Sequence, residues 1–357
     1  MNGVEAGVRP GRDGVLIGPI GVPVRPRILW ATVGLAVLAV AVFAGGIAAG
    51  SAGLTIPQVL AALVGSGDAA SSFIVTELRL PRAAAGAAVG ACLGLAGALT
   101  QTFSRNPLAT PDILGVTSGA AAGAVAAIVL GGGGYSVGAS LLGFGIPVVA
   151  TVGGLVAAAL AYGLAWRGGV DSYRIILIGI GLTASLGGLT SYLLVRAELT
   201  QATAATQWLV GSLSGVSWAS VWPMLVVLGL SVPVLIAQSP GLAVSQLGDD
   251  FSHSLGLALQ RHRLIVIAVA VVLTSTAVSA AGPVEFAAFV APQLAQRLAG
   301  TSRPPLVASA LTGAALVLAA DVLARTLLPG EVPVGIITAV IGAPYLIWLL
   351  IQRKDVR

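Results

Sequence analysis

The sequence predicts an all-α polytopic membrane protein with about ten transmembrane helices. Its 357 residues are 57% hydrophobic and 9% charged, and the mean hydropathy is +0.99. A soluble domain cannot bury that much apolar surface. The apolar residues also fall into runs close to the roughly 20 residues that cross a bilayer. The predicted spans are 28–50, 81–103, 112–130, 144–166, 173–195, 217–237, 263–281, 285–300, 306–324 and 333–351.

The N-terminal residues 1–27 are basic and rich in Gly and Pro, which predicts a mobile cytoplasmic arm. A signal peptide is the alternative. The apolar run 28–50 exceeds the usual signal core of about 7–15 residues, which favours an uncleaved first span. We therefore expect an arm over 1–27, a transmembrane domain over 28–352 and a cytoplasmic tail over 353–357.

Residues 79–120 contain a helix that we expect to be buried among other helices. Small residues at 86, 90, 94 and 97 recur about once per helical turn, and such residues let helix backbones approach closely in a membrane. The segment 104–112 that follows has two prolines and several polar groups, so it cannot face lipid. It is predicted to be a loop at one surface or along a wet cavity.

The basic residues predict the orientation, because cytoplasmic loops are enriched in Lys and Arg. With the N-terminus inside, fourteen basic residues are cytoplasmic and four are outside. Both termini are therefore expected in the cytoplasm, and the four outer arginines need another explanation. The inner set is Arg9, Arg12, Arg25, Arg27, Arg105, Arg167, Arg174, Arg261, Arg263, Arg297, Arg303, Arg353, Lys354 and Arg357; the outer set is Arg79, Arg82, Arg196 and Arg325.

Ten spans divide into two halves of five, and an odd number of spans per half inverts the second half relative to the first. Inverted repeats are a common transporter plan. The sequence itself shows no convincing internal repeat. Residues 202–216 are apolar but short, and they predict a partly embedded or surface helix after the fifth span.

Several kinds of chemistry are disfavoured by the residues that carry it. Lys354 is the only lysine, so the chain has no P-loop of its own. Cys92 is the only cysteine, which excludes an internal disulfide. His253 and His262 have no ligand partners close in sequence, so no metal site is expected.

The chain contains R-x-P-R at 79–82, then Gln101, and then R-N-P-L-A-x-P-x-x-L-G-x-x-x-G-A at 105–120. This pattern resembles the FecCD/BtuC permeases, the membrane subunits of ABC importers for ferric siderophores, haem and vitamin B12. The resemblance covers nearly everything after residue 28. Further matching segments are 247–256, 281–293, 320–325 and 332–344.

The resemblance implies a BtuC-like fold, that of type II ABC importers, with two inverted five-helix halves. Segments 75–82, 164–169 and 247–250 are most similar to the family branch of second permeases in ferric enterobactin importers. This implies a ferric siderophore as cargo, a heterodimer with a sister permease, and a bacterial plasma membrane location. It also implies two separate ABC ATPases that bind the ATP and Mg, and an extracytoplasmic binding protein that delivers cargo. The chain itself is expected to bind no cofactor and to be no enzyme.

The resemblance also assigns three groups of site residues. It implies that Arg79, Arg82 and Arg325 dock the binding protein. It implies that Asn106, Pro107 and Leu108 form the cytoplasmic gate, with Asp171 and Ser172 as a second element of that gate. Coupling to the ATPase falls to the segment 247–257, in which a short helix is expected from about 249 and Gly256 closes it. Its assigned residues are Leu247, Gly248, Asp249, Asp250, Leu255, Gly256 and Leu257.

Two other classes of function stay open from the sequence alone, beside a permease for haem or vitamin B12. An ion- or proton-coupled secondary transporter would use carboxylates within the membrane, for which Glu285 and Asp321 are the candidates. A membrane scaffold without transport leaves the outer arginines and the polar breaks without a role. Glu285 also departs from the small residue that is common at this position in the family, as does Gln293 from the more usual His.

Overall fold

The computed structural model describes residues 14–17, 20–23, 25–50, 53–131, 145–167, 169–170, 172–326 and 331–352. Almost all of them are helical, which confirms the predicted class. The elements are β1 Gly14–Ile17, β2 Ile20–Pro23, α1 Pro26–Ala48, α2 Ile56–Leu63, α3 Ala69–Phe73, the π-helix η1 Ile74–Arg79, α4 Leu80–Ser104, the 3-10 helix η2 Pro111–Leu114, α5 Val116–Leu130, α6 Gly145–Ala165, α7 Ser172–Arg196, α8 Leu199–Leu209, α9 Trp218–Val244, the 3-10 helix η3 Ser245–Leu247, α10 Asp249–Ser254, α11 Leu259–Ala281, α12 Ala287–Ala299, α13 Leu306–Thr326 and α14 Val334–Gln352.

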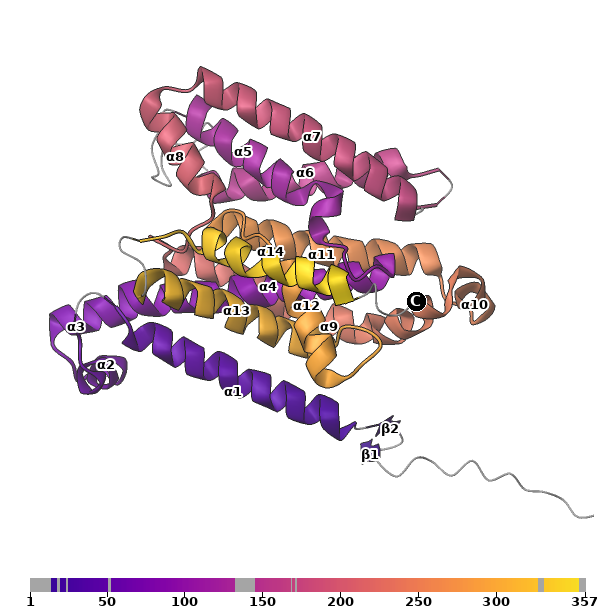
Figure 1. The fold of residues 1–357 in the computed structure, drawn as a ribbon, viewed down its shortest axis with the longest axis horizontal. Coiled ribbons are helices and arrows are strands. Elements are labelled where there is room, and N and C mark those ends of the chain that lie inside the picture. Colours follow the sequence, from indigo (N-terminus) through magenta and orange to yellow (C-terminus); the bar gives the residue numbers. More distant parts are fainter. Residues whose placement is uncertain are drawn as a thin grey trace, which may run out of the picture.

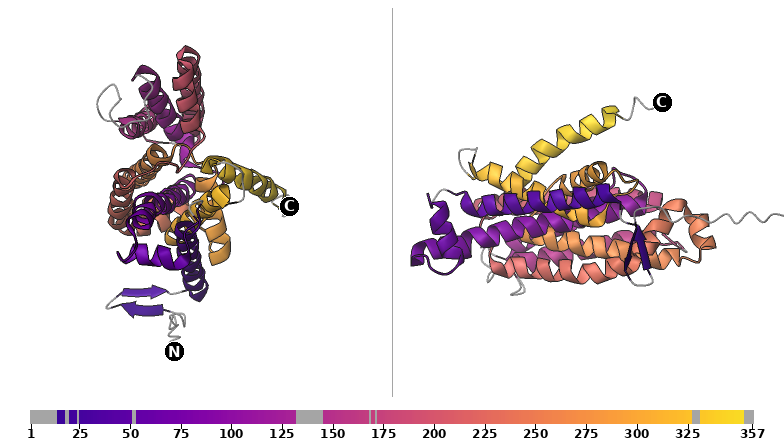
Figure 2. Two further views of the ribbon diagram at one scale, coloured as in Figure 1. Left: turned by 90° about the vertical axis from the view of Figure 1, so that its left-hand side faces the viewer. Right: turned by 90° about the horizontal axis from the view of Figure 1, so that it is seen from below.

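The long helices run roughly side by side, so the molecule has two ends (Figure 1). We call them the α10 end, where α1 begins and α9 passes to α11, and the α3 end, where α2, α3 and α8 lie. Helix α4 lies in the centre and packs against α9, α11, α12 and α13. Helices α5, α6 and α7 form a second group beside this core, and α14 projects from it on another side (Figure 2).

Helix α4 is buried because its glycines let the backbones of α12 and α13 come close. A Cβ atom at Gly90 would lie 2.1 Å from the carbonyl oxygen of Gly313, and one at Gly97 would lie 1.8 Å from that of Ala288. Such contacts leave no room for a side chain, since bulk there would force the helices apart. The expectation of a helix buried among helices is confirmed.

Seven described helices are long and apolar enough to cross a membrane, and α5 and α14 are shorter apolar helices. With α12, which has 13 residues, they are the ten predicted segments. The surface helix expected after the fifth span is α8. The clearest boundary differences are at α4 and α9. The helix predicted from 81 begins at Ala69 and runs through η1 into α4, after Asp68 caps its first turn by accepting a hydrogen bond from the Ser71 amide. The helix predicted to end at 237 continues to Val244.

The described part of the N-terminal arm contains a two-stranded antiparallel hairpin of β1 and β2. The arm was expected to be without structure, so the all-α class has this one small exception among the described residues. The tail 353–357 lies outside them.

Candidate functional site

The loop after α4, residues 105–110, is the predicted inner gate and lies at the α10 end; we call it the gate loop. Helix α4 ends because Arg105 adopts a left-handed conformation, with φ of 50°. The Asn106 side chain then accepts a hydrogen bond from the Leu108 amide at 3.0 Å, and the carbonyl of Asn106 accepts one from the Ala109 amide. Asn106 and Leu108 are exposed, and Pro107 is half-buried.

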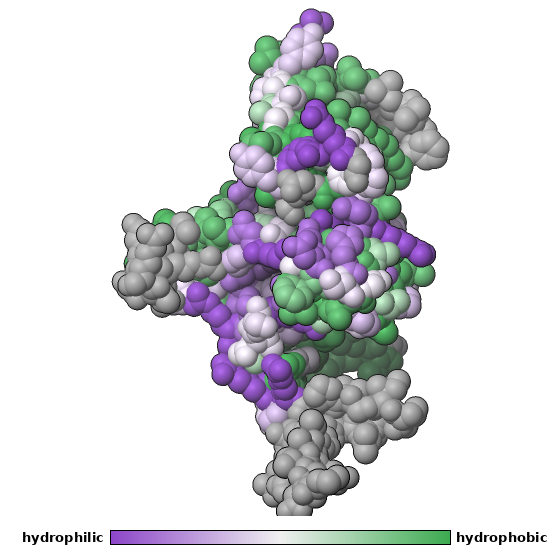
Figure 3. Space-filling view, turned by 90° about the vertical axis from the view of Figure 1, so that its right-hand side faces the viewer, coloured by the Kyte–Doolittle hydropathy of each residue, from purple (hydrophilic) through white to green (hydrophobic). Residues whose placement is uncertain are grey.

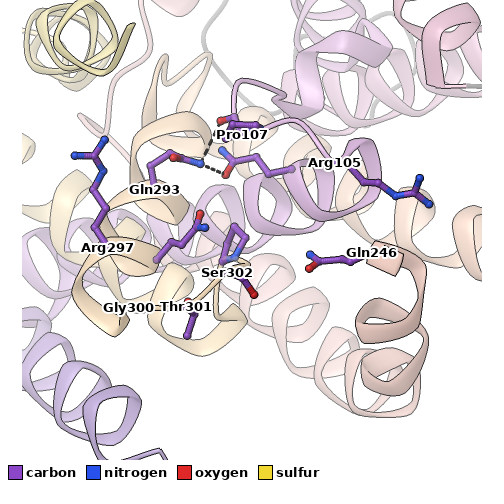
Figure 4. A pocket seen from close by; sticks show the side chains of 11 residues that line it. Arg105, Pro107, Gln246, Gln293, Arg297, Gly300, Thr301 and Ser302 are labelled. Atoms are coloured by element: carbon purple, nitrogen blue, oxygen red, sulfur yellow. Dashed lines mark hydrogen bonds between the residues drawn. The ribbon is translucent and has the colours of Figure 1, made fainter. Parts of the chain in front are cut away.

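A pair of buried glutamines holds the gate loop against α12. The Gln293 amide donates to the side-chain oxygen of Gln101 at 2.7 Å and to the carbonyl of Pro107 at 3.2 Å (Figure 4). Gln101 in turn donates to the Phe289 carbonyl at 3.2 Å. We call Gln101 and Gln293 the glutamine pair. The two residues are 192 positions apart, and the sequence pattern does not indicate that they meet.

The segment 247–257 folds as predicted, with a short helix from Asp249. Gly248 and Gly256 have φ of 108° and 75°, a region that favours glycine, and they flank α10 on either side. Gly256 donates its amide to the His253 carbonyl at 2.9 Å, which closes the helix. Leu247, Phe251 and Leu255 are exposed on the segment. An exposed apolar group on a short, well-defined helix can serve as a contact for another protein.

Asp249 joins this segment to the gate loop. Its carboxylate accepts from the Arg105 guanidinium at 2.5 Å and, through both oxygens, from the Arg263 guanidinium at 2.8 and 2.9 Å. Burial acts to raise the pKa of the Asp249 carboxyl, but hydrogen bonds and charge from the two arginines outweigh it, so the pKa lies below its ordinary value. Arg105 also donates to the Ser245 carbonyl at 2.9 Å. The Asp249 carboxylate therefore joins three parts of the chain. These are the end of α4, helix α11, and the segment 247–257 that carries α10.

A cavity of about 560 Å³ lies beside the gate loop at the α10 end. Figure 3 looks at this end and shows hydrophilic residues gathered in the middle of the face. Amide and hydroxyl side chains dominate the lining, and no Asp or Glu is among the residues that line it. The cavity is lined by Gln101, Arg105, Pro107, Gln246, Gln293, Gln296, Arg297, Gly300, Thr301, Ser302 and Pro304.

The second predicted gate element is described only in part. Asp171 lies outside the described residues, and Ser172 is the first residue of α7. Glu285 is exposed and lies in the non-helical segment between α11 and α12, where it lines a small cavity together with Asp112. Nothing in the spacing of these two acidic residues along the chain indicates that they share a cavity.

Arg79, one of the three predicted docking residues, is buried within the chain. It is 6% exposed, and its guanidinium donates to the carbonyls of Ile47 and Ala48 at 3.0 Å each. These carbonyls belong to the last turn of α1, where a helix carries partial negative charge. Arg79 therefore caps α1 from inside the protein, and its role in docking a binding protein stays a prediction.

Arg82 and Arg325 are likewise engaged within the chain, with side chains 14% and 11% exposed. Both pair with the buried Asp321 at 3.0 Å, and the i, i+4 pair between Asp321 and Arg325 is the one that the sequence predicts. Arg325 also donates to the carbonyls of Gly46 and Ala49 at the end of α1. The contacts of Arg82 and Arg325 are therefore made within the chain, and Asp321 is the counter-ion that they share.

Glu331 completes this cluster at the α3 end. The Ser214 hydroxyl donates to its carboxylate at 2.6 Å, and Arg82 lies 3.5 Å away. That hydrogen bond and the charge of Arg82 hold the pKa of Glu331 below its ordinary value. We call Arg79, Arg82, Asp321, Arg325 and Glu331 the outer charge cluster.

Long apolar helices around a central buried helix, with a hydrophilic face at one end, are the features of a polytopic membrane protein. Residues 37–352 match the FecCD transport family, so the chain belongs to that family. It is a permease subunit of an ABC transporter and not itself an ATPase.

Individual relatives agree with this assignment. The chain is 41% identical to the ferric enterobactin transport system permease protein FepG of Escherichia coli, over 87% of this chain and 92% of that one. It is 40% identical to the cobalamin import system permease protein BtuC of Halobacterium salinarum, over 79% and 74% of the two chains. Its fold matches a solved inward-facing conformation of a metal-chelate type ABC transporter with a TM-score of 0.80 and 28% identity, over 92% of this chain and all of that one.

Proposed function

We propose that this chain is one of two permeases of an importer for a ferric siderophore. The relatives support this cargo, since those named for ferric enterobactin, achromobactin and ferric dicitrate transport are 37–41% identical over most of the chain. The partners would be a sister permease, two ABC ATPases that bind ATP and Mg, and an extracytoplasmic binding protein. The α10 end would face the cytoplasm of a bacterial plasma membrane, in line with the many basic residues there.

One observation supports a coupled, ATP-driven mechanism above all: Asp249 binds Arg105 and Arg263 at once. In the proposal the ATPase contacts the exposed side chains of 247–257. Movement of this segment displaces Asp249, and the ion pair with Arg105 transmits the displacement to the end of α4 and the gate loop. The ion pair thus gives a direct route from the ATPase contact to the gate.

In this mechanism the gate loop closes the inner end of the pathway, and the glutamine pair sets its resting position. Release from the hydrogen bond between Gln293 and the Pro107 carbonyl lets the loop move. Asn106 and Leu108 are then the side chains that cargo passes. The binding protein delivers cargo at the α3 end, where the outer charge cluster keeps the end of α1 and α13 in place.

Cobalamin is the second candidate cargo, because the Halobacterium relative named for cobalamin import is 40% identical. The test is ATP-dependent uptake into proteoliposomes that contain the permease pair and ATPase, with the binding protein outside. Radioiron siderophores and labelled cobalamin are offered in parallel. Siderophore uptake that stops without ATP or without this chain supports the proposal. Uptake of cobalamin alone would show that the cargo is cobalamin and not a siderophore. Uptake of neither would refute the proposal.

A further inference from the structure

Helix α2 lies crosswise to the helices that span the membrane. Figure 1 shows α2 nearly end-on at the α3 end, whereas α1 beside it runs along the length of the molecule. Because α1 and the other long helices cross the bilayer, α2 has the orientation of a helix that lies in the plane of the membrane. It has eight residues, which is too short to cross a bilayer.

One side of α2 packs onto the rest of the protein. Val59 and Ala62 are buried in an apolar cluster that includes Ile47, near the end of α1, and Val75 in η1. The same contacts join α2 to two membrane-spanning helices, α1 and the helix that begins at Ala69. The position of α2 is therefore fixed relative to the ends of both helices.

A second side of α2 is apolar and exposed. Ile56, Leu60 and Leu63 share this side, because they follow the i, i+4, i+7 spacing of one helix face. Their exposed fractions are 68%, 58% and 43%, and Val64, directly after the helix, is exposed as well. No residue from 53 to 67 carries a charge. An apolar face of this kind is costly in water, so another apolar medium is expected to cover it.

The lipid bilayer lies within reach of this face, because α2 lies against a helix at the edge of the bundle. Helix α1 is a candidate span that is mostly exposed, and Val37 and Val40 on it are among its exposed apolar residues. Helix α2 contacts both α1 and η1. It carries none of the aromatic or arginine side chains that are enriched in protein interfaces. These observations favour lipid over a partner protein.

We propose that α2 is an interfacial helix that inserts Ile56, Leu60 and Leu63 at the boundary between lipid headgroups and acyl chains. The partner is a phospholipid surface that is recognised by apolar burial and not by charge, since α2 has no basic side chain. Such helices lie in the membrane plane with the apolar face buried about 5–10 Å into that boundary. The contact holds the ends of α1 and the helix from Ala69 at a fixed depth, and it does not depend on the identity of the cargo.

The test places a nitroxide spin label on single introduced cysteines in the complete transporter in nanodiscs. The natural Cys92 is buried, so the label reports the introduced position. At Leu60→Cys the label should collide more with oxygen, which dissolves in the acyl chains, than with a water-soluble nickel chelate. Val37→Cys on α1 gives the lipid-facing standard. Gln58→Cys, about half a turn around α2 from Ile56 and Leu60, should favour the nickel chelate.

A charge variant supplies a second measurement. Leu60→Glu should lower the midpoint of thermal unfolding in nanodiscs, because it brings a carboxylate into the apolar boundary. Gln58→Glu is the matched control, since its carboxylate can accept the hydrogen bond from the Thr55 amide that the Gln58 oxygen accepts. Its midpoint should match wild type. In water, substitution of a residue as exposed as Leu60 has little effect, so a drop for Leu60→Glu alone supports lipid contact.

The binding protein is the competing occupant, because it is proposed to deliver cargo at the same end. If nickel access at Leu60→Cys is high in the transporter alone and falls when the binding protein is added, the face belongs to that protein and the lipid contact is refuted. Nickel access equal to that of Gln58→Cys under both conditions, or equal midpoints for the two Glu variants, would also overturn the proposal. None of these results bears on whether the transporter imports a siderophore, which the uptake assay decides separately.

Discussion

Replacing Asp249 by Asn should separate ATP hydrolysis from transport. The change keeps the shape of the side chain and removes the charge that holds two guanidinium groups. Arg105 and Asp249 are 38% and 45% exposed, so their pair contributes only about 0.2–1 kcal/mol. Arg263 is 9% exposed and makes two charge-assisted hydrogen bonds, a type of bond that contributes about 1.5–3 kcal/mol. With the two Arg263 bonds taken as one contribution, because Asp249 is 45% exposed, the link as a whole is worth about 2–4 kcal/mol.

A coupling free energy of about 1–3 kcal/mol between two sites means that events at one site change the affinity at the other about 5- to 150-fold. We expect Asp249→Asn to lower the number of chelates imported per ATP about tenfold, while ATP hydrolysis continues. The assay measures both rates in the same proteoliposomes. The exposed neighbour Asp250 provides the comparison, because Asp250→Asn removes an equal charge from the same helix without breaking the link. It should lower the ratio less than Asp249→Asn does.

A double-mutant cycle distinguishes the link from a contact with the ATPase. If Arg105 and Asp249 act through each other, Arg105→Gln should cost little in a chain that already carries Asp249→Asn. Because the pKa of Asp249 is lowered, the carboxylate is charged at neutral pH and the link is lost only as the pH falls through that lowered pKa. The coupling ratio should thus be constant from about pH 6 to 8. Strict additivity of the two substitutions, or a wild-type ratio in Asp249→Asn, would show that the reasoning is wrong.

Three further outcomes follow from the contacts. Gln293→Leu should free the gate loop, so that a cysteine placed in the loop reacts with a thiol reagent at the same rate with and without ATP; persistent dependence on nucleotide would argue against the glutamine pair. Asp321→Asn should cost about 3–5 kcal/mol of stability, because it removes the buried carboxylate that Arg82 and Arg325 share and leaves Arg82 only the exposed Glu331 at 3.5 Å. Glu331→Gln, at a 64% exposed side chain, should cost about 1 kcal/mol or less, as thermal unfolding in detergent would measure. Gly97→Ala should cost about 1–3 kcal/mol by overpacking against α12, while Gly187→Ala, with open space around it, should not destabilise, and equal melting temperatures would contradict the packing.

The features that depend on local sequence were predictable. Runs of apolar residues located the ten helical segments, because length and hydropathy alone decide which stretches can span a bilayer. The spacing of small residues in α4 predicted its burial, since a helix whose backbone approaches its neighbours closely needs a small residue about once per turn. The short helix α10 was predictable from two acidic residues at its start and a glycine after its end. The start of α4 was placed too late, because Glu77 and Arg79 interrupt the apolar run that the helix continues through.

The contacts that make the site were not predictable, because they join residues far apart in the chain. Gln101 and Gln293 are 192 positions apart, and Arg105 and Asp249 are 144 apart. Glutamine and arginine occur on surfaces and in cores alike, so residue type gives no sign of a partner at such a distance. The one pair that could be foreseen, Asp321 with Arg325, lies within a single helical turn.

The outer arginines illustrate how the same charge admits two explanations. Positive charge on the outer side does not serve insertion, and the sequence therefore suggested a partner protein. The structure adds a second explanation at the end of α1, where the last carbonyls accept no hydrogen bond from their own helix, and Arg79 and Arg325 donate to four of these carbonyls. A buried guanidinium is costly unless it is paired, and Asp321 supplies the carboxylate that Arg82 and Arg325 share. Contacts with a binding protein would then fall to side chains at the α3 end that remain exposed, and reversal of Arg325 to Glu would disturb the protein before it disturbed any docking.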